Sequence, residues 1–216
     1  MSELARGWSL RPLGELVSAQ RTQRQPEDIA PETPYVGLEH VESGTGLHTF
    51  QRAGEAGLRS SKFEFLERDL LFGKLRPNLR KVAVAACAGV CSTDLIPLRP
   101  RDPEDAELLA FQLRSPDMAR HIERLVAGAS LPRVNVKDLL GIPIPVPPAE
   151  ERESIRRLAR LLAASQREAA ILALRLGELQ EAAANRLLGR LLSQPPRAGR
   201  RSARRTPSKN AQRDLF

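Results

Sequence analysis

Residues 142–192 decide the architecture of this chain. The stretch begins with the proline-rich segment IPIPVPP (142–148) and continues, from Glu150, as EERESIRRLARLL and a further helix-forming run. Proline fixes its own φ and disfavours helical backbone at the residue before it, so we expect residues 142–147 to be extended. Pro148 suits a first helical turn, and the acids that follow lie at the positive end of the helix dipole. Because no proline interrupts the remainder, it predicts one helix of about 64 Å.

Apolar residues along this helix recur at alternating spacings of three and four, which is the a/d pattern of a coiled coil. An antiparallel pair of copies centred near residues 170–171 would place Leu162 opposite Leu179 of the second copy. The pattern therefore predicts a homodimer with its compact domains at opposite ends. A helix folded on its own domain, or a truncated gene product that awaits a second half, remain alternatives. The predicted seam comprises Ile155, Leu158, Leu162, Ser165, Ala169, Leu172, Leu176, Leu179 and Ala183.

The chain has 216 residues, enough for one domain of about 150 residues with appendages. Its two cysteines, Cys87 and Cys91, cannot build a disulfide framework and have no nearby Cys or His to complete a zinc site. We expect them to be small apolar residues of a buried strand. The polar N-terminus is unlike a signal peptide, and no apolar run reaches the roughly 18 residues of a membrane span, so a cytoplasmic protein is expected.

The net charge of +8 is concentrated at the end of the chain. Residues 193–216 carry seven basic residues and one acidic residue, which leaves only +2 for the rest. The Pro, Arg and Ser content of this tail cannot form a core, so a disordered basic tail is expected. Such a tail favours polyanions, nucleic acid among them, but alone identifies no specific partner.

Residues 1–148 are predicted to form an α+β domain, β-rich in its first half and with short helices in its second. Residues 35–41 (YVGLEHV) alternate apolar and polar side chains as a half-buried strand does. Ser115 followed by Pro116 is a helix start signal, for a helix ending near Gly128. We expect polar loops at 21–33 and 42–57, further strands near 8–10, in two runs within 61–76, at 82–86 and at 95–98, and further helices at 13–17, 103–113 and 135–140.

Motifs of catalysis and nucleotide binding are absent from the sequence, including G-x-G-x-x-G, the P-loop, H-E-x-x-H and G-x-S-x-G. The isolated Gly44-Thr45-Gly46 is expected to be a loop tip. His40, His48 and His121 are scattered and lack further ligands, so no metal site is expected. We therefore predict a protein that is not an enzyme and binds no cofactor itself.

Five segments carry a family resemblance: WSLRPLGEL (8–16), YVGLEHVE (35–42), DLLFGKLRP (69–77), CSTDLIPL (91–98) and IPIPVPP (142–148), the last followed by Glu150, Glu151 and Ile155. In this order they resemble the specificity subunit of type I restriction–modification systems, as one target-recognition domain with its following helix. The resemblance covers residues 8 to about 190. It implies a DNA-reading domain at 1–148 and a spacer and dimerisation helix at 149–192, with the tail at 193–216 outside. Family members usually carry two such domains and two helices.

The resemblance implies a non-catalytic DNA-recognition subunit. Its partners would be double-stranded DNA, a methyltransferase subunit that binds S-adenosylmethionine and, in restriction complexes, a restriction subunit. Two copies related by a twofold axis would read a bipartite site with a gap set by the helix. Apolar residues off the seam, such as Leu161 and Leu174, are assigned to the methyltransferase. A coiled-coil adaptor without sequence-specific DNA reading is the alternative.

The residues expected to contact DNA are of two kinds. Basic residues in KLRPNLRK (74–81), between two predicted strands, suit phosphate contacts, with a solvated turn as the alternative. Polar loops suit base readout in the major groove. Asn78 departs from the family, which often has an aromatic residue there. The predicted DNA-binding residues are Lys74, Arg76, Asn78, Arg80 and Lys81 of the turn, Gln23 and Arg24 of one loop, and Ser130 and Arg133 of another.

The last five residues, QRDLF, resemble the short peptide by which bacterial proteins dock on the DNA sliding clamp. Leu215 and Phe216 would enter an apolar groove, Gln212 would supply hydrogen bonds, and Asp214 stands at the position where the peptide has Asp or Ser. The sliding clamp is therefore a further predicted partner, with a frayed terminus as the alternative.

Overall fold

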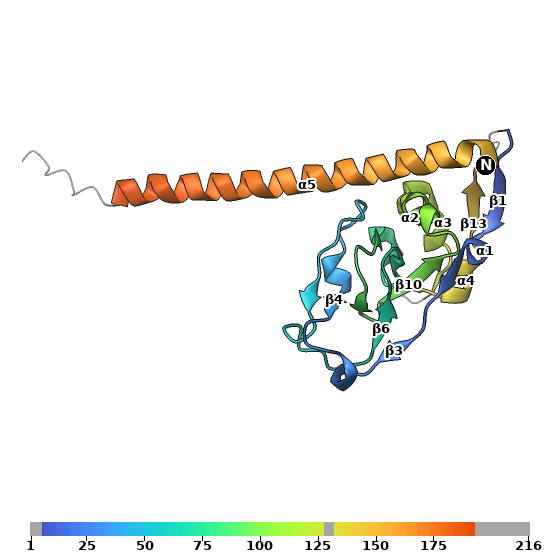
Figure 1. Ribbon diagram of the computed structural model, residues 1–216, viewed down its shortest axis with the longest axis horizontal. Coiled ribbons are helices and arrows are strands. Elements are labelled where there is room, and N and C mark those ends of the chain that lie inside the picture. Colours follow the sequence, from blue (N-terminus) through green and yellow to red (C-terminus); the bar gives the residue numbers. More distant parts are fainter. Residues whose placement is uncertain (1–5, 128–131, 193–216) are drawn as a thin grey trace, which may run out of the picture. The chain divides into compact units, whose positions relative to one another are not determined.

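The computed structural model describes residues 6–127 and 132–192, with the backbone alone for 189–192 (Figure 1). The fold is α+β with one long helix at the end of the described chain, as the sequence predicted. Contacts divide the chain into two units, Met1–Ala170 and Ile171–Phe216. The first half of the long helix thus belongs to the compact unit, whereas the predicted domain boundary lay at its start. None of the helices in the described ranges combines the length and the apolar character needed to cross a membrane.

The elements follow one another as a β-rich half and a more helical half. The strands are β1 (Ser9–Pro12), β2 (Val17–Ala19), β3 (Gln23–Arg24), β4 (Pro34–Val36), β5 (Gln51–Arg52), β6 (Lys62–Phe65), β7 (Leu70–Gly73), β8 (Val82–Val84), β9 (Gly89–Cys91), β10 (Leu95–Pro100), β11 (Val126–Ala127), β12 (Arg133–Val134) and β13 (Pro143–Val146). The helices are α1 (Leu13–Leu16), α2 (Ala106–Arg114), α3 (Pro116–Glu123), α4 (Val136–Leu140) and α5 (Ala149–Leu192), with 3-10 turns η1 (Pro26–Asp28), η2 (Leu38–His40), η3 (Pro77–Leu79) and η4 (Pro103–Asp105).

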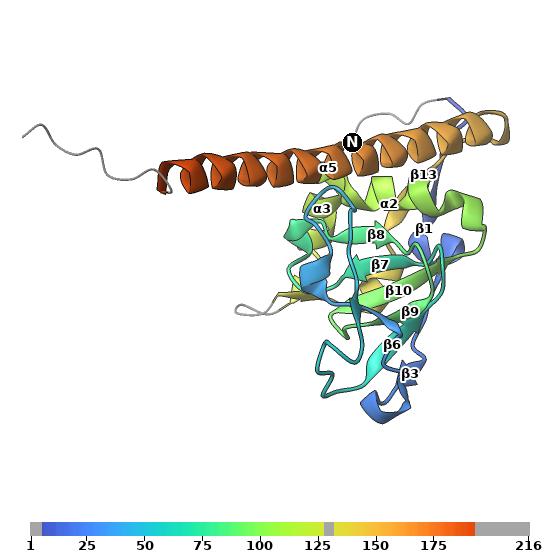
Figure 2. The same cartoon turned by 60° about the vertical axis from the view of Figure 1, so that its left-hand side comes forward.

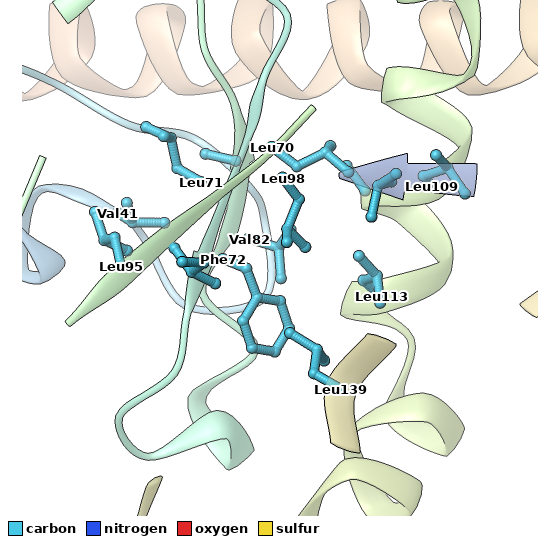
Figure 3. Close-up of a cluster of buried hydrophobic side chains, with 14 of the residues drawn as sticks. Val41, Leu70, Leu71, Phe72, Val82, Leu95, Leu98, Leu109, Leu113 and Leu139 are labelled. Atoms are coloured by element: carbon cyan, nitrogen blue, oxygen red, sulfur yellow. The ribbon is translucent and has the colours of Figure 1, made fainter. Parts of the chain in front are cut away.

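An antiparallel sheet with the strand order β2-β10-β7-β8 forms the centre of the compact unit (Figure 2). Leu70 and Leu71 are neighbours in β7 and are both fully buried, so both faces of the sheet are covered. Helices α2 and α4 add Leu109, Leu113 and Leu139 to the same cluster (Figure 3). Truncating one of these leucines to alanine would cost about 2–5 kcal/mol of stability.

A second sheet, in the order β3-β6-β9-β4-β5, contains the other strands of the β-rich half. Its pairs are antiparallel except for β4 with β9, where Tyr35 lies opposite Val90. Strand β9 was not among the predicted strands. It makes Cys91 part of a buried strand, as expected, whereas Cys87 lies half-buried before that strand.

The proline-rich segment before α5 forms β13, which pairs with β1 from the start of the chain (Figure 1). The extended backbone expected at 142–147 is therefore confirmed. A two-stranded ribbon tolerates these prolines because each strand has an edge without partners. Ile144 is fully buried, so the ribbon is fastened to the core immediately before α5 begins.

The strand expected at 35–41 ends at Val36, which corrects the prediction from alternation. Gly37 turns the chain into η2, and its N–H donates to His40 Nδ1 at 3.0 Å. A Cβ at Gly37 would lie 2.0 Å from the carboxylate of Glu39, so the exposed Glu39 side chain would have to move aside. Alternation alone misses this break because Gly37 occupies a position where the pattern tolerates any small residue.

Two further boundaries differ from the sequence prediction. The loops expected at 21–33 and 42–57 contain the short strands β3 and β5, whose partners β6 and β4 lie elsewhere in the sequence. Helix α3 begins as predicted, because Ser115 Oγ accepts a hydrogen bond from the N–H of Met118 at 3.2 Å. It ends at Glu123 rather than near Gly128, and the chain then enters β11.

Within the compact unit, the first half of α5 packs on the domain through its small side chains. Ala159 and Ala163 are buried, whereas Leu158, Leu161 and Leu162 are exposed. Small residues allow close approach of the helix backbone. The first half of α5 therefore does fold on its own domain, through Ala159 and Ala163 rather than through the seam leucines.

Candidate nucleic-acid interface

The basic turn, residues 74–81, connects β7 to β8 and contains η3. Two of its arginines have left-handed backbone, with φ of 50° at Arg76 and 52° at Arg80. This region costs a residue with a Cβ roughly 1–2 kcal/mol, so other bonds must hold the turn. The N–H of Arg76 donates to the Pro132 carbonyl at 2.9 Å, and the Arg80 carbonyl accepts from the N–H of Gly44 at 3.3 Å. Two segments that are distant in sequence therefore support it.

The first supporting segment brings Arg133 to the basic turn. Leu75 forms a β-bridge with Arg133, so the turn and β12 lie side by side. Arg133 Nη2 donates to Asp94 Oδ1 at 3.0 Å, which neutralises part of its charge. The structure thus groups this predicted DNA-binding residue with those of the turn. Ser130, predicted from the same loop, lies outside the described residues.

The side chains at the tip of the basic turn are accessible to solvent to different degrees. Arg76 and Asn78 are exposed, and Arg80 is half-buried. Within residues 6–127 and 132–192, neither arginine forms an ion pair with an acidic side chain. Guanidinium groups without an internal carboxylate are suited to bidentate contacts with phosphate.

The two lysines of the turn are placed differently from the arginines. Lys81 Nζ donates to the Leu38 carbonyl at 2.8 Å and so ties the turn to η2. Lys74 Nζ lies 5.9 Å from the centroid of the Phe63 ring, within the range of a cation–π contact. We therefore expect Lys81 to act on stability, and Arg76 and Arg80 to be the main phosphate contacts.

The loop that contains Gly44 is part of this site, which the sequence reasoning missed. The backbone at Gly44 has φ of 76°, which favours glycine, and a Cβ there would lie 2.9 Å from Arg80 Nη2, so Gly44 and Arg80 lie in contact. Ser43 Oγ donates to the carbonyl of Leu79 and fastens the loop to η3. The signal in the sequence is the pair of glycines at 44 and 46 in an otherwise polar loop.

Gln23 and Arg24 lie on β3, in the five-stranded sheet rather than in the basic turn. Both are exposed. Arg24 Nε donates to Glu64 Oε1 at 2.5 Å across to β6, so its charge already has a partner. An exposed pair of this kind is worth about 0.2–1 kcal/mol, and DNA could displace it at little cost.

Metal and thiol chemistry have little support in the described residues. Across 6–127 and 132–192 no group of three or more His, Cys, Asp or Glu side chains is placed to hold a metal ion. Burial raises the pKa of the Cys91 thiol to about 12, so the reactive thiolate is not formed near neutral pH.

The predicted seam residues of α5 lie on a face that the single chain leaves open. Ile155 is half-buried, and every seam leucine is exposed. Such an apolar stripe is typical of a helix that packs on another chain. Pairing of two copies stays a prediction. The clamp-like residues Gln212, Asp214, Leu215 and Phe216 lie outside the described residues.

A set of ion pairs between α5 and residues 102–107, which span η4 and the first turn of α2, was not predicted and is here called the ion-pair network. Arg156 Nε donates to Asp105 Oδ1 at 2.7 Å, and its Nη2 donates to Asp102 Oδ2 at 2.5 Å. The signal in the sequence was an acidic run, DPEDAE (102–107), matched by arginines four residues apart in the helix. The remaining pairs are Arg160 with Glu104 at 2.7 Å and Arg167 with Glu107 at 3.4 Å.

Known proteins share this sequence and fold in part. No family model matches the chain. The specificity subunit of the type I restriction enzyme EcoDI from Escherichia coli is 30% identical over 165 residues, which is 76% of this chain and 36% of that protein. The chain resembles a type I restriction specificity subunit. The predicted resemblance is thus confirmed, and the chain spans about a third of the length of this specificity subunit.

Solved specificity subunits have the same fold. The HsdS subunit from Thermoanaerobacter tengcongensis gives a TM-score of 0.59 at 24% identity, over 84% of this chain and 48% of that one. The S subunit from M. genitalium gives 0.57 at 17% identity, over 83% and 45% of the chains. A chain from a structure of type I restriction–modification complex assembly gives 0.61 at 21% identity, over 92% and 52%. At these identities the likeness establishes the fold alone.

Proposed function

We propose that this chain recognises a specific DNA sequence as a specificity subunit with one target-recognition domain. The observation that supports it is the 30% identity to the EcoDI specificity subunit, together with a basic turn whose Arg76 and Arg80 have no ion pair among the residues that the structure describes. In this proposal Arg76 and Arg80 contact phosphates, which fixes the register of the domain on the duplex without reading bases. The candidates for contacts to base edges are Asn78 and Arg133 at the basic turn and Gln23 on β3.

Two copies would pair antiparallel through the exposed seam of α5. The twofold axis would relate two identical DNA-reading domains, so the recognised site would consist of two symmetric halves with a gap between them. Support comes from the exposure of Leu158, Leu162 and Leu172 in the single chain.

The chemistry would be carried out by partners. A methyltransferase subunit would bind S-adenosylmethionine and methylate the DNA that this chain selects, with Leu161 and Leu174 as contacts, and a restriction subunit would join in a cleaving complex. The C-terminal QRDLF would add a tether to the DNA sliding clamp. Deleting residues 212–216 tests the tether separately, since pull-down of the clamp should then disappear while sequence selection is kept.

The decisive experiment is selection from random duplex DNA by the full chain together with its methyltransferase. Enrichment of two identical half-sites at a constant gap is the expected result. Binding without any enriched sequence would reject the proposal and favour the alternative, a coiled-coil adaptor. Light scattering in the same buffer measures the dimer, and a strict monomer at micromolar concentration would reject the paired arrangement.

A further inference from the structure

The ion-pair network holds α5 to the domain through a nearly buried arginine. The Arg156 side chain is 11% exposed, and it bridges two carboxylates at the two ends of η4, Asp102 just before it and Asp105 at its end. The hydrogen bonds that Arg156 donates, first to Asp105 and second to Asp102, raise the pKa of its guanidinium. Because a guanidinium is planar and its N–H groups diverge at known angles, two carboxylates at once restrict both its position and its orientation.

The network extends along the helix. Arg156, Arg160 and Arg167 are separated by four and seven residues, which places them on one face over about 16 Å of helix. Their partners outside α5 all lie within residues 102–107, and Arg160 also contacts Glu153 of its own helix at 2.7 Å. The alanines between them, Ala159 and Ala163, set how closely the helix approaches the domain. Their small side chains do little to stop the helix from sliding along its axis. The charged pairs therefore define where the helix sits along its axis and how far it is rotated.

The seam shares this stretch of helix with the network. Leu158 lies between Arg156 and Arg160 in the sequence, and Leu162 lies two residues after Arg160. Both leucines are exposed and face away from the domain. A slip of α5 by one helical turn would move these leucines about 5.4 Å relative to the domain, and DNA advances about 3.4 Å per base pair. A shift of one turn thus corresponds to more than one base pair.

We propose that Arg156 is a positioning residue that sets the gap between the two halves of the DNA site. This rests on the proposed function, in which two copies pair through the seam. Arg156 acts on the gap by locking the helix against the domain, and it takes no part in reading bases. Loss of the lock allows several helix positions, and hence several gaps, while each domain still selects its own half-site.

The test uses the full chain with its methyltransferase and a library of duplexes with random half-sites and variable gaps. For Arg156→Ala we expect unchanged half-site sequences, and a ratio of the preferred gap to its neighbours that falls about tenfold, equivalent to 1.4 kcal/mol. Arg157→Ala is the matched control, because Arg157 is the next residue of the same helix and is exposed. It should leave both readouts unchanged.

Arg156→Glu combined with Asp105→Lys restores opposite charges and should recover part of the gap preference. If circular dichroism shows that Arg156→Ala does not fold, the more exposed pair is removed instead, with Arg160→Gln and Glu104→Gln. A folded variant with an unchanged gap preference overturns the inference alone. Absence of half-site enrichment in the wild type overturns the proposed function itself, so the two failures are distinguishable.

Discussion

Two groups of arginines in this protein look alike in sequence and differ in their surroundings. Arg156 and Arg160 on α5 contact the carboxylates of residues 102–105, whereas Arg76 and Arg80 of the basic turn have no ion pair among the described residues. The first group uses its charge to join two elements of the domain. The second holds its charge toward the surface on a strained backbone. A basic residue in the sequence can therefore be assigned to a DNA contact only after its ion pairs within the protein have been identified.

The difference follows from the energetics of charge burial. Removing a guanidinium from water is costly, so a nearly buried arginine persists only with carboxylates that replace its hydration. An exposed arginine needs no such partner and can exchange water for phosphate, with release of counterions from DNA. Substitutions in the first group should therefore change stability and geometry, and those in the second should change DNA affinity.

The largest expected effect comes from Arg156→Ala, which would leave Asp102 and Asp105 without their common partner. Breaking a buried ion pair from one side costs about 3–5 kcal/mol, and we expect about 3 kcal/mol because Asp102 is half exposed. Urea denaturation followed by circular dichroism measures it. Arg157→Ala should stay within about 0.5 kcal/mol. Equal effects of the two substitutions would mean that the network does not stabilise the domain.

The second effect concerns DNA rather than stability. Arg76→Ala combined with Arg80→Ala should weaken binding to all duplexes and reduce the slope of log affinity against log salt by about 2, because two phosphates would no longer be neutralised. Fluorescence anisotropy at several salt concentrations gives the slope. Arg157→Ala serves as control, since Arg157 is an exposed arginine of α5 outside the candidate site. A double variant with the wild-type slope would remove the basic turn from the DNA interface.

A smaller effect is expected for Lys81→Ala. The ammonium group of Lys81 donates to the Leu38 carbonyl, so its loss should cost about 1 kcal/mol of stability and leave the salt slope unchanged. Thermal unfolding measures the loss of stability, and the anisotropy titration measures the salt slope. A reduced slope at constant stability would instead return Lys81 to the phosphate contacts predicted from sequence.

The smallest effect is a pH dependence at His48. Burial first, and then the charge of Arg167, lower the pKa of His48 below 6.5. Below that pH the unfolded chain binds a proton that the folded state does not, so stability falls as the pH drops through 6.5 toward the lower folded pKa. The slope from this group is at most about 1.4 kcal/mol per pH unit. Urea titrations between pH 5 and 8 should show a shallower decline for His48→Gln, and identical profiles would contradict the assignment.

Sequence patterns predicted most of the local structure, whereas the DNA-binding role of the named residues stays a prediction. The helix cap at Ser115 could be predicted because its two partners, the Ser115 side chain and the backbone N–H of Met118, lie only three residues apart. The same reasoning missed β9 and the end of the strand at Val36. There the outcome depends on pairing with distant strands and on the tight turn at Gly37, which no local period encodes.

Which of the predicted residues lie together was not predictable from the sequence. Arg133 reaches the basic turn through a β-bridge to Leu75, and Gly44 reaches it through contact with Arg80. Gln23 and Arg24, predicted alongside them, lie on another sheet. These contacts join residues that are tens of positions apart in the sequence, so neither composition nor local spacing predicts them.

By itself, the sequence determined that a proline-stiffened strand precedes one long helix with a heptad stripe, because both features follow from backbone restrictions repeated within a few residues. Only the tertiary structure decided which face of that helix meets the domain. The buried face carries Arg156, Ala159 and Ala163 rather than the leucines. The reason is that carboxylates 54 and 51 residues earlier in the chain are folded into position to receive the guanidinium. The local sequence predicts that Arg156 lies in a helix, whereas the fold decides which carboxylates it contacts.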